Sequence, residues 1–155
     1  MKRPISNARR GRFITFEGPE GGGKSTQVRL LAKRLTRAGI EVYCTREPGG
    51  TPVGDAIRSL LQYERKGEAL CPEAELLLFM ASRAQHVREV ILPRLDRGTW
   101  VISDRFADST TAYQGYARGL GVAKVLELNR FAVGRAVPDL TLLLDIDVAA
   151  GFLRI

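Results

Sequence analysis

A glycine-rich segment between two apolar stretches constrains this chain more than any other feature. It reads Gly18-Pro19-Glu20-Gly21-Gly22-Gly23-Lys24-Ser25 and has the spacing G-x-x-x-x-G-K-[ST]. Residues 13–16 before it are typical of a strand, and the apolar positions of residues 28–35 after it fit one helix face. Glycines allow consecutive backbone N–H groups to wrap an anion, and the following helix directs its positive end at it. The segment therefore predicts a phosphate loop that binds a nucleoside triphosphate.

Two side chains at the end of this loop have defined chemical roles. Lys24 supplies a charge for the terminal phosphates, and the Ser25 hydroxyl is placed to bind Mg²⁺. The residues expected to contact the triphosphate are Gly18, Pro19, Glu20, Gly21, Gly22, Gly23, Lys24, Ser25 and Thr26.

Length and composition indicate a single globular domain. The chain has 155 residues, of which 45% are hydrophobic and 26% charged. We expect a basic arm over residues 1–11 and a phosphate-loop domain over residues 12–155. Cys44 and Cys71 form neither a metal-binding cluster nor a disulfide framework, which favours reduced thiols in the cytoplasm. We expect no membrane segment, because no apolar run approaches the required length.

The formal net charge of +7 raises nucleic-acid binding as an alternative. Much of the basic excess lies in the arm, and elsewhere the arginines stand singly near glycines and acids. No recognition-helix or aromatic RNA-binding pattern accompanies them, so we expect no nucleic-acid partner.

Strand and helix patterns alternate along the whole chain. Strands are expected at residues 13–16, 41–45, 99–104 and 140–145, and helices lie between them. The third helix begins near Pro72, carries Leu76 and Leu77 inward, and is bent or restarted at Pro93. This order predicts an α/β fold, a doubly wound parallel sheet with helices on both faces and ligands at the carboxyl ends of the strands.

The segments at those carboxyl ends are the most specific part of the sequence. Residues 46–51 follow the second strand and residues 104–119 follow the third; we expect both to be loops. Phe79 and Arg83 stand four apart on the third helix and share a face. Together with residues 18–26, these segments resemble the thymidylate kinase family over residues 13 to about 147. The resemblance implies the P-loop nucleoside monophosphate kinase fold.

The resemblance also implies roles in an acceptor pocket for thymidine monophosphate. Glu20 contacts the deoxyribose 3′-hydroxyl, Phe79 stacks on thymine, and Arg83 bonds a ring carbonyl. Arg58 and Arg105 hold the monophosphate. The open alternatives are a solvated acid for Glu20, core packing for Phe79 and a solvated helix face for Arg58. The full set expected to bind this substrate is Glu20, Glu47, Pro48, Arg58, Phe79, Ser82, Arg83, Arg105, Thr110, Tyr113 and Gln114.

The expected reaction is transfer of the γ-phosphoryl group of ATP to thymidine monophosphate. Lys24, Arg105 and Asp104 are the expected catalytic residues, and Ser25 and Asp104 the expected Mg²⁺ site. The resemblance further implies a cis bond at Glu47-Pro48 and a homodimer formed through helices. His86, the only histidine, is expected to be exposed and structural.

Two questions stay open at this stage. In the family, a lid and a fifth strand follow the fourth strand, so a chain that stops at Ile155 is expected to be an N-terminal portion truncated before them. The alternatives to thymidine monophosphate phosphorylation are another P-loop nucleoside or deoxynucleoside kinase and a non-catalytic nucleotide-binding switch. Binding of thymidine monophosphate distinguishes these alternatives.

Overall fold

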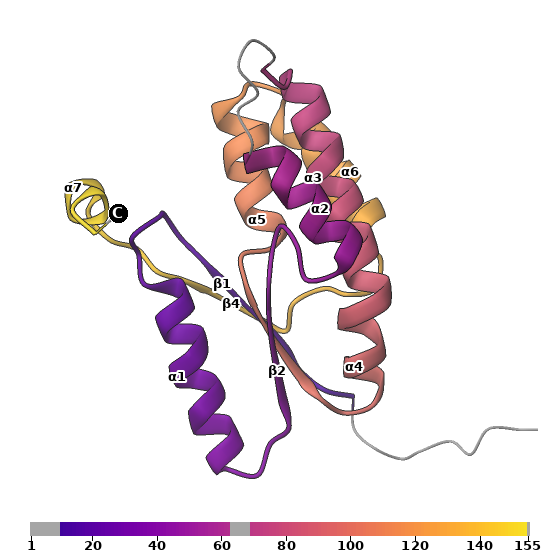
Figure 1. The fold of residues 1–155 in the computed structure, drawn as a ribbon, viewed down its shortest axis with the longest axis vertical. Helices are drawn as coiled ribbons and strands as arrows, with labels where there is room; N and C mark the ends of the chain where they lie inside the picture. Colours follow the sequence, from indigo (N-terminus) through magenta and orange to yellow (C-terminus); the bar gives the residue numbers. More distant parts are fainter. Residues whose placement is uncertain (1–9, 63–68, 155) are drawn as a thin grey trace, which may run out of the picture.

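The protein is built on a parallel four-stranded sheet. The computed structural model describes residues 10–62 and 69–154, so most of the expected basic arm lies outside the described residues. The strands are β1 (Phe13–Glu17), β2 (Val42–Arg46), β3 (Trp100–Asp104) and β4 (Leu140–Leu143), and their order in the sheet is β2-β3-β1-β4. Figure 1 shows the fold, with β1, β2 and β4 labelled near its centre. Phe16 pairs with Asp104 of β3 and with Leu142 of β4, so these strands end at one edge of the sheet.

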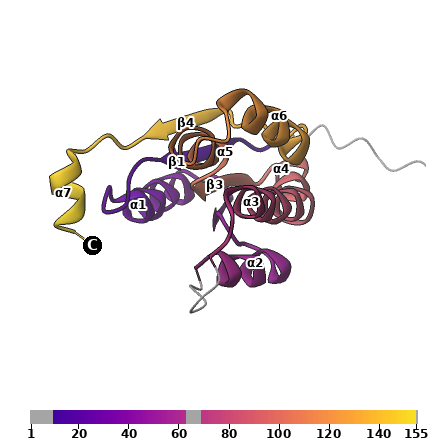
Figure 2. The ribbon, with the colours of Figure 1, turned by 90° about the horizontal axis from the view of Figure 1, so that it is seen from above.

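Helices cover both faces of this sheet, as the sequence predicts. Successive side chains of a strand point to opposite faces. Accordingly, Phe13 and Val101 pack against η1 (Val87–Ile91) and α4 (Leu92–Asp96), while Ile14 and Ile102 pack against α1 (Lys24–Arg37). Figure 2 shows α1 separated from the group formed by α3 (Pro72–His86), α4 and α6 (Val122–Val133). The remaining helices are α2 (Pro52–Gln62), α5 (Ala107–Thr110), η2 (Thr111–Ala117) and α7 (Val148–Phe152).

The long third helix is interrupted near its proline, as expected. α3 continues directly into the π-helical turn η1 and then into α4, which begins at Leu92. Pro93 has no backbone N–H for the preceding turn, and this missing hydrogen bond accounts for the change in helical register.

Two expectations about helices were wrong. Residues 107–117 are helical (α5 and η2), although the segment that follows the third strand was expected to be a loop. Tertiary packing stabilises the helical conformation of this segment. Thr110, Gln114 and Gly115 are buried, and a Cβ on Gly115 would lie 3.4 Å from Cα of Val122. Leu77 is 58% exposed, because Leu76 and Met80 occupy the buried face of α3 and the next position turns away from it.

Two further expectations concern the cysteines and membrane-spanning helices. Cys44 and Cys71 are free and exposed. Within the described ranges, none of the helices combines the length and the apolar character needed to cross a bilayer.

The packing of the sheet predicts that two leucines differ strongly in their contribution to the free energy of unfolding. Leu95 of α4 is fully buried in the cluster around Phe13, whereas Leu30 of α1 is 56% exposed. Leu95→Ala should lower the free energy of unfolding by about 2–5 kcal/mol through lost burial and a residual cavity. Leu30→Ala, the same chemical change, should alter it by roughly 0.5 kcal/mol or less. Urea unfolding of both variants measures this; equal losses would contradict the assigned core.

Candidate functional site

The phosphate loop joins β1 to α1 and encloses its lysine. Lys24 is the first residue of α1 and is only 7% exposed. Its Nζ donates to the carbonyl oxygens of Gly18 at 3.0 Å and Pro19 at 2.6 Å. Burial, and then the nearby charge of Arg105, lower the pKa of the Lys24 ammonium. Gly23 precedes the helix at φ 84°, a left-handed conformation that favours glycine. The loop therefore places an ammonium beside the amino end of a helix, as phosphate binding requires.

Ser25 and Asp104 meet at the point where α1 begins and β3 ends. The Ser25 hydroxyl donates to the Asp104 carboxylate at 2.5 Å. Mg²⁺ prefers oxygen ligands, and in nucleotide sites it takes one or two from the protein and the rest from water and phosphate. One hydroxyl and one carboxylate fit this requirement. Across residues 10–62 and 69–154, no group of three or more acidic, histidine or cysteine side chains forms a fuller metal site.

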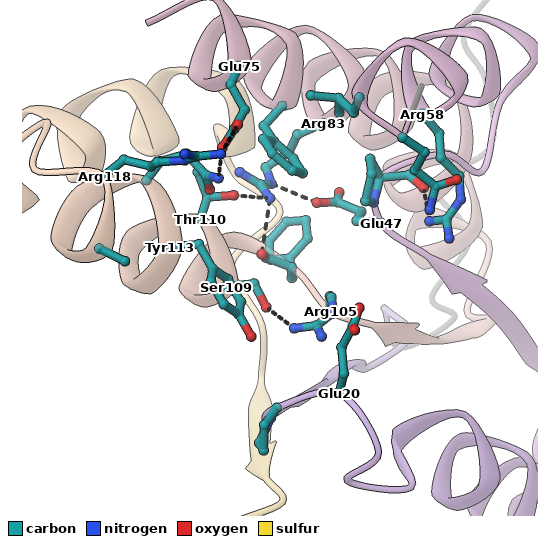
Figure 3. A pocket seen from close by; sticks show the side chains of 18 of the residues that line it. Glu20, Glu47, Arg58, Glu75, Arg83, Arg105, Ser109, Thr110, Tyr113 and Arg118 are labelled. Carbon is teal, nitrogen blue, oxygen red and sulfur yellow. Dashed lines mark hydrogen bonds and ion pairs between the residues drawn. The ribbon is translucent and has the colours of Figure 1, made fainter. Parts of the chain in front are cut away.

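A cavity of about 760 Å³ lies beside the loop (Figure 3). Its walls come from α2, α3, α5 and η2, and from the segment that follows β2. The expected site residues that line it are Pro19, Glu20, Glu47, Pro48, Arg58, Phe79, Arg83, Arg105, Thr110, Tyr113 and Gln114. This volume falls within the range of small-molecule sites in proteins.

Among the described residues of the cavity wall, Arg83 makes the most side-chain hydrogen bonds. Its guanidinium is 2% exposed and donates through Nε to Glu47 at 2.7 Å. Nη1 donates to Asn129 Oδ1 at 2.7 Å, and Nη2 donates at 3.0 Å to both the Phe106 carbonyl and Thr110 Oγ1. Described residues thus accept four of the five guanidinium hydrogens. Arg83 ties together segments that are far apart in the sequence.

Glu47 connects this arginine to a second buried group. Its other carboxylate oxygen lies 3.1 Å from Nδ1 of His86, and Nε2 of His86 lies 2.7 Å from Thr45 Oγ1. The expectation that His86 is exposed was wrong, since it is fully buried and helps hold Glu47. The Glu47-Pro48 peptide bond is cis, as the resemblance implies.

Two arginines place positive charge on the wall of the cavity. Arg105 adopts φ 69°, and its Nη1 donates at 3.1 Å to both the Gly18 carbonyl and the Ser109 hydroxyl. Its guanidinium carbon lies 5.6 Å from the centre of the Tyr113 ring. Arg58 donates to the Pro48 carbonyl at 3.0 Å, and burial, then the charge of Arg46, lower the pKa of its guanidinium.

The remaining expected residues have varied environments. The Gln114 amide donates to Glu75 at 2.6 Å, so its nitrogen already has a partner. Ser82 is buried and accepts from the Gly49 N–H at 3.2 Å rather than lining the cavity. Thr26 lies exposed on α1.

The acids that hold the expected binding residues in place were not predicted from the sequence. Glu17 is 4% exposed, and burial raises its pKa although Ser109 and the Phe106 N–H donate to it. Glu75 holds Gln114 and also accepts from Arg118 at 2.9 Å. Glu17 directly precedes the phosphate loop, and β-strand alternation places it on the face of Phe13. That alternation is a sequence signal that could have found it.

Comparison with known proteins agrees with this geometry. The family model described as thymidylate kinase matches residues 16–155, almost the whole chain. The chain belongs to the thymidylate kinase family. A thymidylate kinase of Citrifermentans bemidjiense is 56% identical over 144 residues, 93% of this chain and 64% of the relative. One of Thermomicrobium roseum is 57% identical over 142 residues, 92% of this chain and 66% of the relative.

A solved structure confirms the fold. The crystal structure of thymidylate kinase from Ehrlichia chaffeensis matches with a TM-score of 0.82 and 42% identity, over 93% of this chain and 81% of that one. The fold is therefore the P-loop nucleoside monophosphate kinase fold. The chain spans slightly less than two thirds of the length of the two relatives above.

The buried ion pair of the cavity predicts a large effect on stability. Arg83→Met should cost about 3–5 kcal/mol of unfolding free energy, because it leaves the Glu47 carboxylate buried without its guanidinium. Arg118→Met is the matched control: its ion pair with Glu75 is 56% exposed on the arginine side and should contribute about 1 kcal/mol or less. Denaturant unfolding compares the two, and similar losses would show that burial does not determine the strength of the Arg83 network.

Proposed function

We propose that the protein transfers the γ-phosphoryl group of ATP to thymidine monophosphate with Mg²⁺, which gives thymidine diphosphate. The position of Arg105 is the observation that supports this most strongly. Its guanidinium contacts the Gly18 carbonyl of the phosphate loop and also lines the acceptor cavity. A cation at the boundary of both sites is suited to bring a donor and an acceptor phosphate together.

The proposed mechanism depends on alignment and charge neutralisation. Lys24 and the loop N–H groups bind the triphosphate, and Arg58 and Arg105 hold the acceptor phosphate opposite it. The acceptor oxygen is already anionic, so no strong general base is needed. Ser25 and Asp104 would hold Mg²⁺, which neutralises charge on the phosphate oxygens.

We further propose that the cavity selects a thymine deoxynucleotide. Phe79 offers an aromatic face to the base, and one Nη1 hydrogen of Arg83 is left by the described residues for a ring carbonyl. Glu20 would accept from the 3′-hydroxyl, and the Tyr113 ring would lie beneath the deoxyribose. Thr110 and Gln114 are proposed to border the pyrimidine edge.

Two assignments from the resemblance also remain proposals. We propose a homodimer formed through helices; Val53 and Leu60 of α2 and Leu77 of α3 are exposed apolar side chains that suit such an interface. Light scattering on the purified protein measures the oligomeric state. We propose a cytoplasmic location, in keeping with the exposed free cysteines Cys44 and Cys71.

The phosphate-loop assignment predicts a selective loss of ATP binding. Lys24→Ala should weaken Mg-ATP binding by at least about tenfold, because it removes the charge that meets the terminal phosphates. Lys33→Ala removes an exposed lysine from the same helix and should leave the affinity unchanged. Calorimetric titration of Mg-ATP tests both variants; unchanged affinity in Lys24→Ala would overturn the assignment.

The cavity predicts discrimination between two pyrimidine monophosphates. Thymidine monophosphate should bind more tightly than deoxycytidine monophosphate by about 1–3 kcal/mol, roughly 5- to 150-fold. Cytosine presents an amino group where thymine has a carbonyl, and two donors would then face each other at Arg83. Equal affinities would reject the base-edge role of Arg83 and favour a kinase of another specificity; binding of neither would favour the nucleotide switch.

A further inference from the structure

A chain of hydrogen bonds connects a buried acid to the cation at the boundary of the two sites. Glu17 Oε2 accepts from the Ser109 hydroxyl at 2.5 Å, and that hydroxyl accepts from Nη1 of Arg105 at 3.1 Å. The guanidinium therefore donates to the hydroxyl, and the hydroxyl in turn donates to the carboxylate. Ser109 and Arg105 line the cavity (Figure 3), whereas Glu17 is buried and does not line it.

The same acid holds the backbone on which Arg105 is mounted. Glu17 Oε1 accepts from the Phe106 N–H at 2.8 Å, and the Arg105 N–H donates to the Phe16 carbonyl at 2.9 Å. Arg105 adopts φ 69°, a conformation that costs energy in a residue with a side chain. Hydrogen bonds on both sides of this residue keep the strained conformation in place.

These contacts determine which edge of the guanidinium remains for a ligand. Both hydrogens of Nη1 have acceptors, one the Gly18 carbonyl and the other Ser109. Within the described part of the chain, Nε and Nη2 of Arg105 have no hydrogen-bond acceptor. The edge formed by Nε and Nη2 presents two parallel N–H groups, which is the geometry that binds two oxygens of a phosphate.

We propose that Glu17 is a positioning residue that acts through Ser109 and the Phe106 N–H to present the Nε and Nη2 edge of Arg105 to the acceptor phosphate. This inference rests on the proposed function, since it names how that function's acceptor is held. A carboxylate suits this role because it accepts from the hydroxyl and the backbone N–H at the same time. Burial behind the cavity wall keeps Glu17 away from the phosphate, so its negative charge does not compete with Arg105 for direct contact.

Binding of thymidine monophosphate and of thymidine distinguishes a positioning role of Glu17 from general support of the fold. Thymidine monophosphate and thymidine differ only in the phosphate, so loss of Arg105 orientation should weaken the first and spare the second. Ser109→Ala and Glu17→Gln should each reduce thymidine monophosphate affinity by about tenfold, with thymidine affinity changed less than about twofold. A merely structural defect would weaken both ligands together. Calorimetry on the full chain measures all of these affinities.

A conservative variant, a control variant and an Arg105→Met background complete the test. Ser109→Thr keeps the hydroxyl and should retain most of the monophosphate affinity, and Ser59→Ala, an exposed serine of α2, should change neither affinity. In an Arg105→Met background, Glu17→Gln and Ser109→Ala should have no further effect on monophosphate binding, because the group they position is gone. Additive losses in that background would overturn the proposal.

The outcomes also separate the inference from the proposed function. If the unaltered protein binds neither ligand, the proposed function fails and the positioning role fails with it. If it binds thymidine monophosphate, but Ser109→Ala weakens thymidine equally or weakens neither ligand, the positioning role alone is rejected. Ser109 lines the cavity and is only partly buried. Its variants therefore test the relay, the hydrogen-bond chain from Glu17 through Ser109 to Arg105, even if Glu17→Gln does not fold.

Discussion

Burial of the Arg83 guanidinium is the constraint on which the candidate site depends. A charge that is 2% exposed requires acceptors on nearly all of its N–H groups, and these come from Glu47, Phe106, Thr110 and Asn129. The acceptors belong to the segment after β2, the segment after β3, α5 and α6. Satisfying one arginine therefore fixes the relative positions of several cavity walls.

The parallel sheet supplies the other half of the site. Because β1 and β3 are neighbours with Phe16 opposite Asp104, the phosphate loop and the segment from residue 104 leave the sheet side by side. This brings Ser25 to Asp104 and Gly18 to Arg105 without any long connection. The phosphate loop and the cavity meet at Arg105, whose strained backbone is held by hydrogen bonds to Phe16 and Glu17 of β1.

The parts of this molecule that depend on local pattern were predictable from the sequence. Apolar periodicity and the glycine spacing were sufficient for the strands, most helices and the phosphate loop. The helical turns of residues 107–117 were not, because the burial of Thr110 and Gln114 depends on contacts with α3, which is distant in the sequence. The burial of His86 and the relay from Glu17 likewise depend on partners more than 35 residues away. The resemblance implied that Arg83 belongs to the site, but only the structure shows that described residues accept four of its five guanidinium hydrogens.

A crystal structure of the chain with thymidine monophosphate tests the central claim most directly, namely that the cavity is the acceptor site and Arg105 its link to the phosphate loop. The account predicts the base against Phe79 and the phosphate within hydrogen-bonding distance of Nε and Nη2 of Arg105, with Arg58 nearby. A monophosphate bound away from this cavity, or with its phosphate turned from Arg105, would contradict it.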